Sequence, residues 1–383
     1  MKRIILSVTN DLFSDQRVDK VCNTLTTMGF HVTLVGRRYK NSPKLPPRNY
    51  QTQRLHLFFT TGPLFYAEFN LRLFFYLLFK KVDILVANDL DTLLPNVLIK
   101  KIRNKKLVYD AHEYFCGILE IQHRPRIKKT WQRIERYCFP KTDAVITVSH
   151  SIADKYKEEY GKEVAVVRNI PVLGTVGGEW HKVKGNVGAQ NFAPKTEKPV
   201  IILQGNAIHK DRGGEEIIEA MPFIHNATLL VVGQGDMIPY MKERVKELDL
   251  QERVIFTGRV TPEILKTYTA SADLGIAFDK NVSPNHYYSL PNKLFEYIHA
   301  GVPVISSDLP ERKRIIEQYE VGVVLSDLAP QTVADAINSI LKNEELFIRL
   351  KENCKMATQE LNWENEEEVI RRIYSDYFVE IKP

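Results

Sequence analysis

Short apolar runs alternate with longer amphipathic segments along residues 1–170. The short runs have the length of buried strands, and the segments between them repeat their apolar residues with a helical period. The predicted strands are Ile4–Val8, Val32–Val35, Ile84–Ala87, Leu107–Tyr109 and Ala144–Val148, and the predicted helices include Asp15–Met28 and Arg126–Phe139. This alternation is typical of a parallel sheet with helices on both faces.

The pattern lapses after Pro171 and resumes at Val200. The intervening stretch, residues 172–199, holds five glycines without a clear period, so we expect a linker with at most a small hairpin. The later strands are predicted at Val200–Leu203, Leu229–Val232, Val254–Phe256, Leu274–Ala277 and Val302–Ile305, and the helices at Gly214–Met221, Met237–Leu248, Pro262–Ala270 and Asn292–His299. The fold class is therefore α/β, with two doubly wound parallel-sheet domains at 1–172 and 199–363 joined by a linker at 173–198.

Length and cysteine content fit this division. Single cores stop growing near about 250–300 residues, so 383 residues favour two domains. The four cysteines are far apart and share no CxxC spacing, which argues against a zinc site or a disulfide framework and favours a cytoplasmic location. The apolar segment Leu71–Lys81 is too short to span a membrane, and we expect a helix buried in the core. Shallow insertion of its aromatic face into a membrane surface is the alternative.

The charge is distributed unevenly between the two halves. Residues 1–200 carry 33 lysines and arginines against 18 acidic residues, whereas residues 201–383 carry 20 against 29. The basic residues are densest from Lys100 to Lys141. A solvated surface explains part of this excess, and an anionic membrane or a phosphorylated lipid explains it more specifically. Nucleic acid is disfavoured, because no nucleic-acid-binding motif is present.

Three glycine-bearing turns follow predicted strands of the second domain, at Gly205, Gly233 and Gly258. In doubly wound sheets, ligands bind outside the carboxyl ends of the strands, where glycine lets the backbone approach them. The first turn, QGNAIHKDRGG, also carries Lys210 and Arg212, so we expect it to bind a diphosphate. A solvated basic turn is the alternative, since the sequence of a phosphate-binding Walker loop is absent.

The stretch SLPNKLFEYIHAGVPVISSD places a turn, a cation and an acid close together. Its Leu-Pro-Asn turn leads into the predicted helix at Asn292, whose first amides have no partner within the helix. Lys293 adds a positive charge beside these amides, and Glu296 offers two acceptor oxygens to a vicinal diol such as that of ribose. Together they predict a nucleoside-diphosphate site. In the alternative interpretation, both side chains merely cover a helix surface.

These motifs resemble those of the retaining glycosyltransferases of family 4. The most similar segments are FTGRVTPEILKTYTASADLGI and LPNKLFEYIHAGVPVISSD, followed by DQRVDKVCNTLTTMGFHVTLVG, YDAHEYF and TVSHSIADKY. The resemblance implies the GT-B fold, in which two Rossmann-like domains face each other across a cleft and the last helix, here 364–383, packs back on the N-terminal domain. It also implies that the C-terminal domain binds a nucleotide-sugar.

The resemblance implies roles for individual residues. Arg212 resembles the cation that binds the diphosphate, Glu296 the acid that binds ribose, and His112 a residue beside the donor sugar. The implied catalytic set is His112, Arg212 and Lys210. The implied donor-binding set is Gly205, Asn206, Arg212, Gly233, Gly258, Arg259, Leu290, Pro291, Asn292, Lys293 and Glu296, and the implied acceptor or sugar side is Asp15, Arg17 and Glu113.

The chain departs from the family pattern in three places. Tyr288 occupies the position of the first acid in the family's pair of glutamates, which bears on the identity of the donor sugar. Asn206 replaces a basic residue after Gly205, which leaves Lys210 and Arg212 as the expected phosphate cations. The first strand lacks a glycine-rich loop, so Asp15 and Arg17 are expected to take over contacts to the sugar or acceptor. The alternative for both is charge at a helix N-terminus.

The resemblance implies transfer with retention and without a metal. The cations and the helix amides would stabilise the leaving diphosphate, the phosphate would take the acceptor's proton, and no cofactor would be needed. Asp89 and Asp91 match the DxD motif of other glycosyltransferases, but they follow a strand in the basic half, so a helix start with an N-cap is expected instead. The expected acceptor is a glycan or lipid-linked glycan of the cell envelope, reached from the inner face of the membrane, and the expected activity is that of a hexosyltransferase.

Two other functions remain compatible with the sequence. A sugar-nucleotide 2-epimerase would use the same nucleotide pocket, with acid and base groups drawn from Asp15, Asp89 and Glu113. A catalytically silent nucleotide-sugar-binding partner protein would account for the missing first glutamate.

Overall fold

The computed structural model describes residues 1–13, 15–175 and 198–375. Most of the predicted linker, including any hairpin within it, lies outside these described residues. The chain divides into two compact units. The first comprises Met1–Asn169, Ser283–Asn285 and the chain from Glu366 onward, and the second comprises Ile170–Val282 and His286–Asn365.

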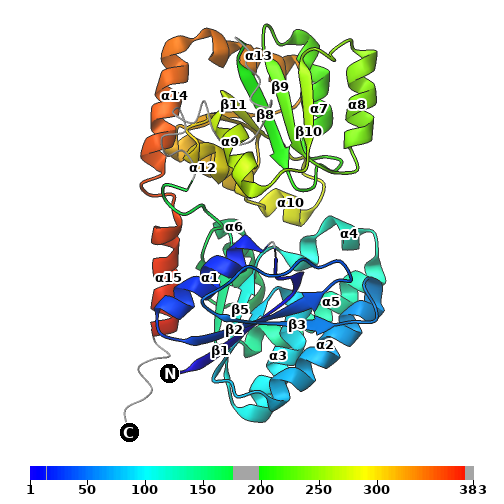
Figure 1. Ribbon diagram of the computed structural model, residues 1–383, viewed down its shortest axis with the longest axis vertical. Helices are drawn as coiled ribbons and strands as arrows, with labels where there is room; N and C mark the ends of the chain where they lie inside the picture. Colours follow the sequence, from blue (N-terminus) through cyan, green and yellow to red (C-terminus); the bar gives the residue numbers. More distant parts are fainter. Residues whose placement is uncertain (14, 176–197, 376–383) are drawn as a thin grey trace. The chain divides into compact units, whose positions relative to one another are not determined.

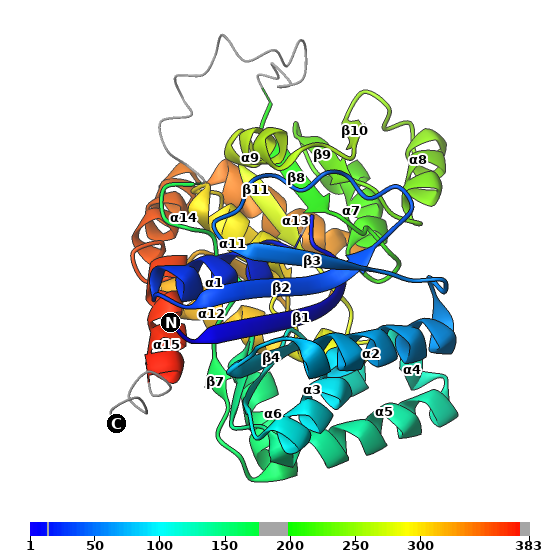
Figure 2. The same ribbon diagram turned by 60° about the horizontal axis from the view of Figure 1, so that its bottom comes forward.

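The first unit is built on a seven-stranded parallel sheet of order β3-β2-β1-β4-β5-β6-β7 (Figure 1). Its strands are β1 (Arg3–Asp11), β2 (His31–Arg38), β3 (Gln51–His56), β4 (Ile84–Asn88), β5 (Lys106–Ala111), β6 (Ala144–Thr147) and β7 (Ala165–Val166). Its helices are α1 (Gln16–Thr27), α2 (Gly62–Phe79), α3 (Leu90–Arg103), α4 (Leu119–Gln122), α5 (Pro125–Cys138) and α6 (His150–Tyr160). In Figure 2, α2, α3 and α5 group together on one side of this sheet, away from α1.

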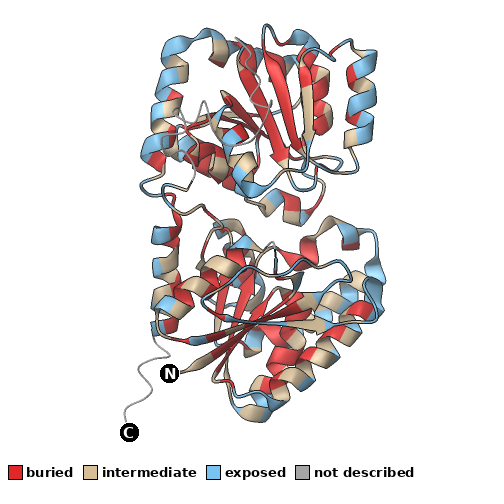
Figure 3. Cartoon of the chain, in the orientation of Figure 1, coloured by how far each residue is buried: buried red, intermediate tan, exposed pale blue. Residues whose placement is uncertain are grey.

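The second unit is built on a six-stranded parallel sheet of order β10-β9-β8-β11-β12-β13. Its strands are β8 (Val200–Gly205), β9 (Thr228–Gly233), β10 (Val254–Gly258), β11 (Leu274–Ala277), β12 (Val304–Ser307) and β13 (Gly322–Leu325). The helices after the linker are α7 (Gly214–Ala220), α8 (Ile238–Glu247), α9 (Pro262–Ala270), α10 (Pro284–Tyr288), α11 (Asn292–His299), α12 (Pro310–Tyr319), α13 (Pro330–Lys342), α14 (Glu344–Ala357) and α15 (Trp363–Ser375). One apolar cluster packs on each face of the sheet, and the central strands of both units are largely buried (Figure 3).

The structure confirms the predicted fold class of two doubly wound parallel-sheet domains. It also contains β3, β7 and β13, which the sequence pattern did not predict. The sequence of β3 is QTQRLH, and its side chains are exposed or only partly buried. A strand at the edge of a sheet can be polar on both faces, because only one neighbour pairs with it and charged residues there prevent further pairing.

The expectation that the segment from Leu71 to Lys81 is a helix buried in the core is wrong. The segment belongs to α2, which begins earlier, at Gly62, and buries only one face. On its other face Leu71 is 58% exposed, Phe75 49% and Phe79 80%. Within residues 1–13, 15–175 and 198–375, no helix is long and apolar enough to cross a membrane.

The last helix, α15, contacts α1 and the segments that follow α1 and β7 in the first unit. The carboxylate of Glu366 accepts hydrogen bonds from the amide and Nε of Arg168, at 2.6 and 2.7 Å. Glu367 accepts another from Thr24 Oγ1 at 2.7 Å. The buried ring of Tyr374 meets the edge of Phe30, with 6.2 Å between the ring centroids. The far end of α15 therefore forms part of the core of the first unit.

Truncating this anchor should loosen the first unit. Because Tyr374 is fully buried, we expect Tyr374→Ala to lower the free energy of unfolding by about 3–5 kcal/mol. Hydrogen exchange should then accelerate in α1 and β2. Arg372→Ala, at an exposed position of the same helix, serves as the control and should change stability by less than about 0.5 kcal/mol. Faster exchange confined to residues 198–360 would contradict the assignment.

Candidate functional site

The site in the second unit lies where its strand order changes direction. The chain runs outward from β8 to β9 and β10, and then returns to β11 on the other side of β8. At such a switch point the loops after the two central strands diverge, and a crevice opens at their carboxyl ends. The loop after β8 carries Arg212, and the loop after β11 carries Asp279. The start of α11 follows soon after.

Asp279 and Arg312 form a buried ion pair at this point. Both side chains are fully inaccessible to solvent. One terminal nitrogen of Arg312 bonds to the Asp279 carboxylate and to Ser289 Oγ, and the other donates to Ala277 O at 3.0 Å. An isolated buried charge is strongly unfavourable, so each group requires the other.

Two further cations surround the same carboxylate. Arg212 Nε lies 3.6 Å from Asp279 Oδ1, and the Arg212 side chain is 40% exposed. Lys293, on the first turn of α11, interacts electrostatically with Asp279. Burial would raise the pKa of Asp279, but Arg312, Lys293 and Arg212 together hold it below its usual value. The carboxylate is therefore ionised at neutral pH.

The balance of charge leaves this cluster positive. Three cations, those of Arg212, Lys293 and Arg312, surround the carboxylate of Asp279. Positive charge is still in excess when the carboxylate of Glu296 is also counted. Burial lowers the pKa of Lys293, Asp279 and Glu296 oppose this effect, and the two arginines add to it, so that the pKa is about 8. A lysine in this environment gains stability when an anion binds beside it. The cluster can thus hold a multiply charged anion.

The start of α11 adds backbone donors to the cluster. Pro291 is its N-cap residue, and no side chain caps the helix. The first amides of a helix lack partners within it and carry the positive end of the helix dipole. Because Lys293 lies on this first turn, the amides and the cation favour the same anion.

A chain of hydrogen bonds orients Glu296. Gln204, buried at the end of β8, donates from Nε2 to Glu296 Oε2 and accepts through Oε1 from Thr269 Oγ1 at 2.7 Å. Its backbone amide donates to the hydroxyl of the buried Tyr297 at 3.2 Å. The second carboxylate oxygen of Glu296 does not take part in the bond from Gln204. The arrangement fixes the direction in which this carboxylate can accept further hydrogen bonds.

The three predicted glycine turns lie at the ends of adjacent strands, but their glycines have different roles. Gly205 and Gly233 are register partners on β8 and β9. A Cβ on Gly233 would lie 1.9 Å from the carbonyl oxygen of Gly205, so sheet pairing itself requires glycine at this position. Gly258 has a φ of 69° and open space where a Cβ would be. The left-handed backbone conformation alone explains why glycine occupies this position, so no ligand is needed to account for it.

The other predicted donor-side residues lie at the rim of the cluster. Asn206, Lys210, Arg259 and Asn292 are exposed, while Leu290 and Pro291 are partly buried in the turn before α11. Tyr288, at the position of the family's first acid, is partly buried at the end of α10, and its ring packs against that of Tyr287. The predicted residues Arg212, Lys293 and Glu296 are therefore the ones that the structure brings together with Asp279.

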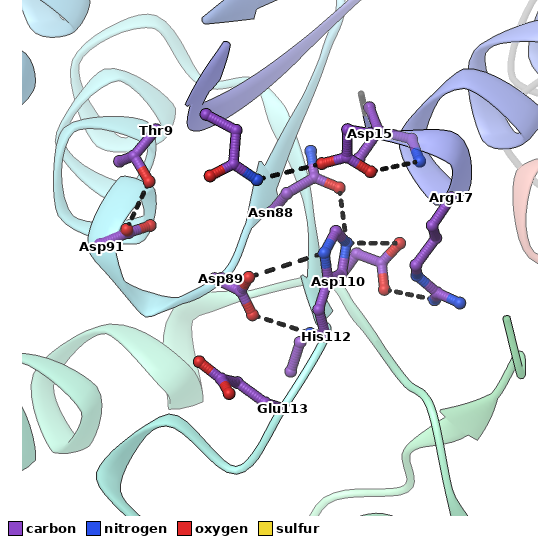
Figure 4. A network of polar contacts seen from close by, with 12 residues as sticks. Thr9, Asp15, Arg17, Asn88, Asp89, Asp91, Asp110, His112 and Glu113 are labelled. Atoms are coloured by element: carbon purple, nitrogen blue, oxygen red, sulfur yellow. Dashed lines mark hydrogen bonds and ion pairs between the residues drawn. The ribbon is translucent and has the colours of Figure 1, made fainter. Parts of the chain in front are cut away.

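A second polar network lies at the carboxyl ends of β4 and β5 in the first unit. Figure 4 shows His112 between the carboxylates of Asp89 and Asp110. Its Nδ1 is 3.6 Å from Asp89 Oδ2, and its Nε2 is 3.7 Å from Asp110 Oδ2 and 3.2 Å from Asn88 Oδ1. Burial lowers the pKa of His112, but the two carboxylates outweigh it and raise the pKa to about 9. Burial also raises the pKa of Asp89 to about 8, so His112 and Asp89 together hold at least one proton at neutral pH.

Arg17 does not lie where a sugar contact would need it. Its side chain is only 4% exposed, and it donates to Asp110 Oδ1 at 2.7 Å and to Val167 O at 2.6 Å. The expected direct contact between Arg17 and a sugar or acceptor is thus incompatible with its position. Burial would raise the pKa of Asp110, but Arg17 and His112 lower it to about 2. Arg17 acts by holding Asp110 ionised beneath His112.

Asp15 and Glu113 lie at the edges of the same network. Asp15 is the N-cap of α1 and accepts from the amide of Val18 at 3.1 Å, which fits the helix-terminus alternative. Its other oxygen accepts from Asn10 Nδ2 at 3.2 Å. Glu113 is partly buried and accepts from Asn285 Nδ2 at 2.9 Å.

The helix predicted at the DLD sequence is present, but its cap is not. Helix α3 begins directly after Asp89, whose side chain makes no capping bond. The Asp89 carboxylate instead accepts from the amide of His112 at 2.8 Å. Asp91 accepts from Thr9 Oγ1 at 2.6 Å, and burial raises its pKa to about 7. Asp89 thus organises the loop after β5, and Asp91 connects the start of α3 to β1.

Comparison with known proteins identifies the family. The model of glycosyl transferases group 1 matches residues 189–357, and that of glycosyltransferase family 4 matches residues 15–170. The chain is a group 1 glycosyltransferase. These two matches span both units, including the cluster around Asp279 and the network around His112.

Individual relatives support the same assignment. An uncharacterized glycosyltransferase of Methanocaldococcus jannaschii is 25% identical over 81% of this chain and 79% of its own length. Phosphatidyl-myo-inositol mannosyltransferase of Mycobacterium leprae is 27% identical over 47% of each chain. Among solved structures, sucrose-phosphate synthase of Thermosynechococcus elongatus superposes with a TM-score of 0.79 at 19% identity, covering 99% of both chains. Anabaena HepE in complex with UDP-glucose gives 0.72 at 15%, covering 98% of this chain and all of its own. These likenesses show the GT-B fold of this glycosyltransferase.

Removing one partner of the buried pair should destabilise the second unit. We expect Arg312→Met to lower the free energy of unfolding by about 3–5 kcal/mol, because it leaves Asp279 buried without its main counter-ion. The neighbouring Lys313 is 43% exposed and pairs with Asp308 at the surface, so Lys313→Met should change stability by at most about 1 kcal/mol. Chemical denaturation of both variants measures the difference. Equal stabilities would show that the pair is not a determinant of this unit.

Proposed function

We propose that this glycosyltransferase transfers a hexose from a nucleoside-diphosphate-sugar to a glycan or lipid-linked acceptor, with retention and without a metal. The observation that carries the proposal is the positive cluster around Asp279 at the open start of α11. Its excess charge suits a diphosphate, and Glu296 beside it suits the ribose of a nucleotide. Solved neighbours bound to UDP and to UDP-glucose, and relatives named mannosyltransferases, support this choice of substrates.

The cluster would act most strongly as the glycosidic bond breaks. Negative charge then grows on the leaving diphosphate, and fixed positive charges nearby lower the energy of the transition state. Lys293 and Arg212 are held against Asp279 before any substrate binds, so little reorganisation is needed. Lys210 is exposed on the same loop as Arg212 and would approach the phosphates when they bind. Because these groups supply the positive charge, the proposed reaction requires no metal.

The position of His112 between two acidic groups is compatible with retention. Asp89 and Asp110 raise its pKa, which favours the protonated ring, and a protonated ring has no free lone pair to accept the proton of the acceptor hydroxyl. His112 can instead donate hydrogen bonds and stabilise negative charge, which fits a role beside the donor sugar. The proton of the acceptor would then go to the leaving phosphate, on the same face of the sugar.

One observation favours the 2-epimerase as a second candidate. Burial raises the pKa of Asp91 to about 7, close to the value that suits proton transfer at neutral pH. Asp91 interacts electrostatically with Glu113 and His112. Incubation with nucleotide-sugars in the absence of any acceptor separates the two functions, because an epimerase converts its substrate under these conditions and a transferase does not.

Loss of the Glu296 charge should weaken ribose recognition selectively. Glu296→Gln removes a charge-assisted hydrogen bond of about 1.5–3 kcal/mol, so affinity for the ribonucleoside diphosphate should fall about ten- to a hundredfold. Affinity for the 2′-deoxy analogue should change far less. Calorimetric titration measures both, and Glu243→Gln, at an exposed position on α8, is the control. An equal loss of affinity for the two nucleotides, or no loss for either, would show that Glu296 does not bind the ribose.

Nucleotide affinity should also depend on pH through Lys293. The free protein holds the pKa of Lys293 at about 8, and a bound diphosphate favours the charged form. Affinity should therefore be full below pH 8 and fall by up to about tenfold per pH unit above it, because binding must then take up a proton. Lys293→Gln should bind more weakly and lose this dependence. A wild-type affinity that is constant from pH 7 to 9.5 would contradict the account.

We also propose that the protein is cytoplasmic and binds anionic membranes at the inner face, where it glycosylates an envelope glycan. The support is the exposed apolar face of α2, at Leu71, Phe75 and Phe79, together with the basic excess of residues 1–200. Aromatic side chains on a helix surface insert into the headgroup region, and nearby lysines attract anionic lipids. This combination suits an acceptor that remains anchored in the membrane.

Vesicle binding tests the membrane proposal. The wild type should bind phosphatidylglycerol vesicles at low salt and detach near 1 M salt, where the Debye length falls to about 3 Å. Phe75→Ser/Phe79→Ser should bind at least about tenfold more weakly, whereas Phe223→Ser, at a 45% exposed position of the second unit, should bind normally. Equal retention of all three proteins, or no retention of the wild type, would exclude α2 as the membrane contact.

A further inference from the structure

A basic hollow lies at the carboxyl ends of β2 and β3 in the first unit, away from the network around His112. It has a volume of about 610 Å³. Its walls include Arg38, Ser42, Lys44, Thr52, Arg54 and His56. None of the described residues that line it is acidic. We call this site the β2–β3 hollow.

Strand register brings the basic side chains of the hollow together. Arg38 on β2 is the register partner of His56 on β3. Successive side chains of a strand alternate between its faces, so Arg54 and His56 lie on the same face. Arg38 and Arg54 are therefore diagonal neighbours with like charges, which is unfavourable, and a bound anion would offset their repulsion.

The carboxylate of Asp11 holds two residues of the hollow, Arg54 and Ser42, in place. Arg54 Nε lies 3.7 Å from Asp11 Oδ1, and its Nη2 donates to Pro43 O at 2.8 Å. Ser42 Oγ bonds to the same aspartate and accepts from the amide of Tyr39 at 2.7 Å. These contacts tether the loop after β2 to the end of β1. Arg54 is thereby held in place, with only 11% of its side chain exposed.

The chemistry of the hollow suits a phosphate group. Guanidinium groups match the geometry of phosphate oxygens and bind them through paired hydrogen bonds, and Lys44 adds a further positive charge. Asp11 pairs with Arg54, whereas no acidic residue is among the described residues that line the hollow beside Arg38 and Lys44, so positive charge remains there.

The strand order gives the separation between the hollow and His112 along one edge of the sheet. In the order β3-β2-β1-β4-β5, the strand before His112 is three places from β2 and four from β3. Strands in a sheet are about 4.8 Å apart, which separates the hollow from the end of β5 by roughly 14–19 Å. An acceptor of a few sugar units can span this distance along one edge of the sheet.

We propose that the β2–β3 hollow binds a phosphate or diphosphate group carried by the glycan acceptor, while the accepting hydroxyl lies near His112. This inference rests on the proposed transferase function and specifies its acceptor as a phosphorylated glycan. The hollow would thereby select acceptors by length, since only a phosphate at the correct distance from the accepting sugar can occupy it.

Hydrogen exchange of the full chain tests the hollow with inorganic pyrophosphate and, separately, a hexose 1-phosphate. Both should slow exchange in residues 38–56. Arg38→Gln/Lys44→Gln should raise the concentration for half-maximal protection there by about tenfold or more, because two charged contacts are lost. The control Arg126→Gln/Lys129→Gln removes the same charge from exposed positions of α5 and should behave as wild type.

The same experiment separates this inference from the proposed function. Protection of residues 204–214 and 290–297 by a nucleoside diphosphate reports on the donor site independently. If the nucleoside diphosphate protects the donor site but the soluble phosphates do not protect residues 38–56, the proposal for the hollow is wrong and the proposed transferase function stands. Protection of the hollow by phosphatidylglycerol vesicles but by neither soluble phosphate would also overturn it, since the contact would then be with a charged surface and not with a discrete phosphate group.

Discussion

The donor side of this glycosyltransferase depends on the buried ion pair of Asp279 and Arg312. Removing two charges from water is unfavourable, and the pair is tolerated because backbone and hydroxyl groups complete its hydrogen bonding. Arg312, on α12, reaches Ala277 at the end of β11 and Ser289 just before α11. One guanidinium therefore fixes the strand end, the turn and the helix start that together form the anion site. The same pair leaves Asp279 able to hold Arg212 and Lys293 in position.

The two units use charge in opposite ways. In the second unit, one carboxylate holds three cations, and the excess is positive. In the first unit, Asp89 and Asp110 raise the pKa of His112, while Arg17 keeps Asp110 ionised. In both units a buried carboxylate, that of Asp279 or Asp110, lies beside the cationic group that is expected to meet a substrate. Substitution of these buried partners should therefore affect catalysis as well as stability.

The sequence predicted most of the apolar strands, because a short continuous apolar run in an α/β chain is typical of a strand buried on both faces. It did not predict the apolar edge strand β13. It did not predict β3, whose polar residues only an edge strand can accommodate. It mistook α2 for a core helix because both of its faces are apolar, and only the packing shows that one of them is exposed. In the site, Arg212, Lys293 and Glu296 stood out through their place in motifs. Arg312 and Gln204 did not, because charged and polar residues are expected at the surface and their burial depends on tertiary structure. Arg17 was misassigned for the same reason.

The central claim is that the second unit binds a nucleoside diphosphate at the positive cluster around Asp279, without a metal. Isothermal titration of the purified protein with UDP, GDP and ADP, each in the presence of EDTA, tests it most directly. The account predicts saturable binding of at least one of the three to a single site, with affinity that survives chelation of divalent metals. Binding of none of them under these conditions, or binding that appears only after a divalent metal is restored, would contradict it.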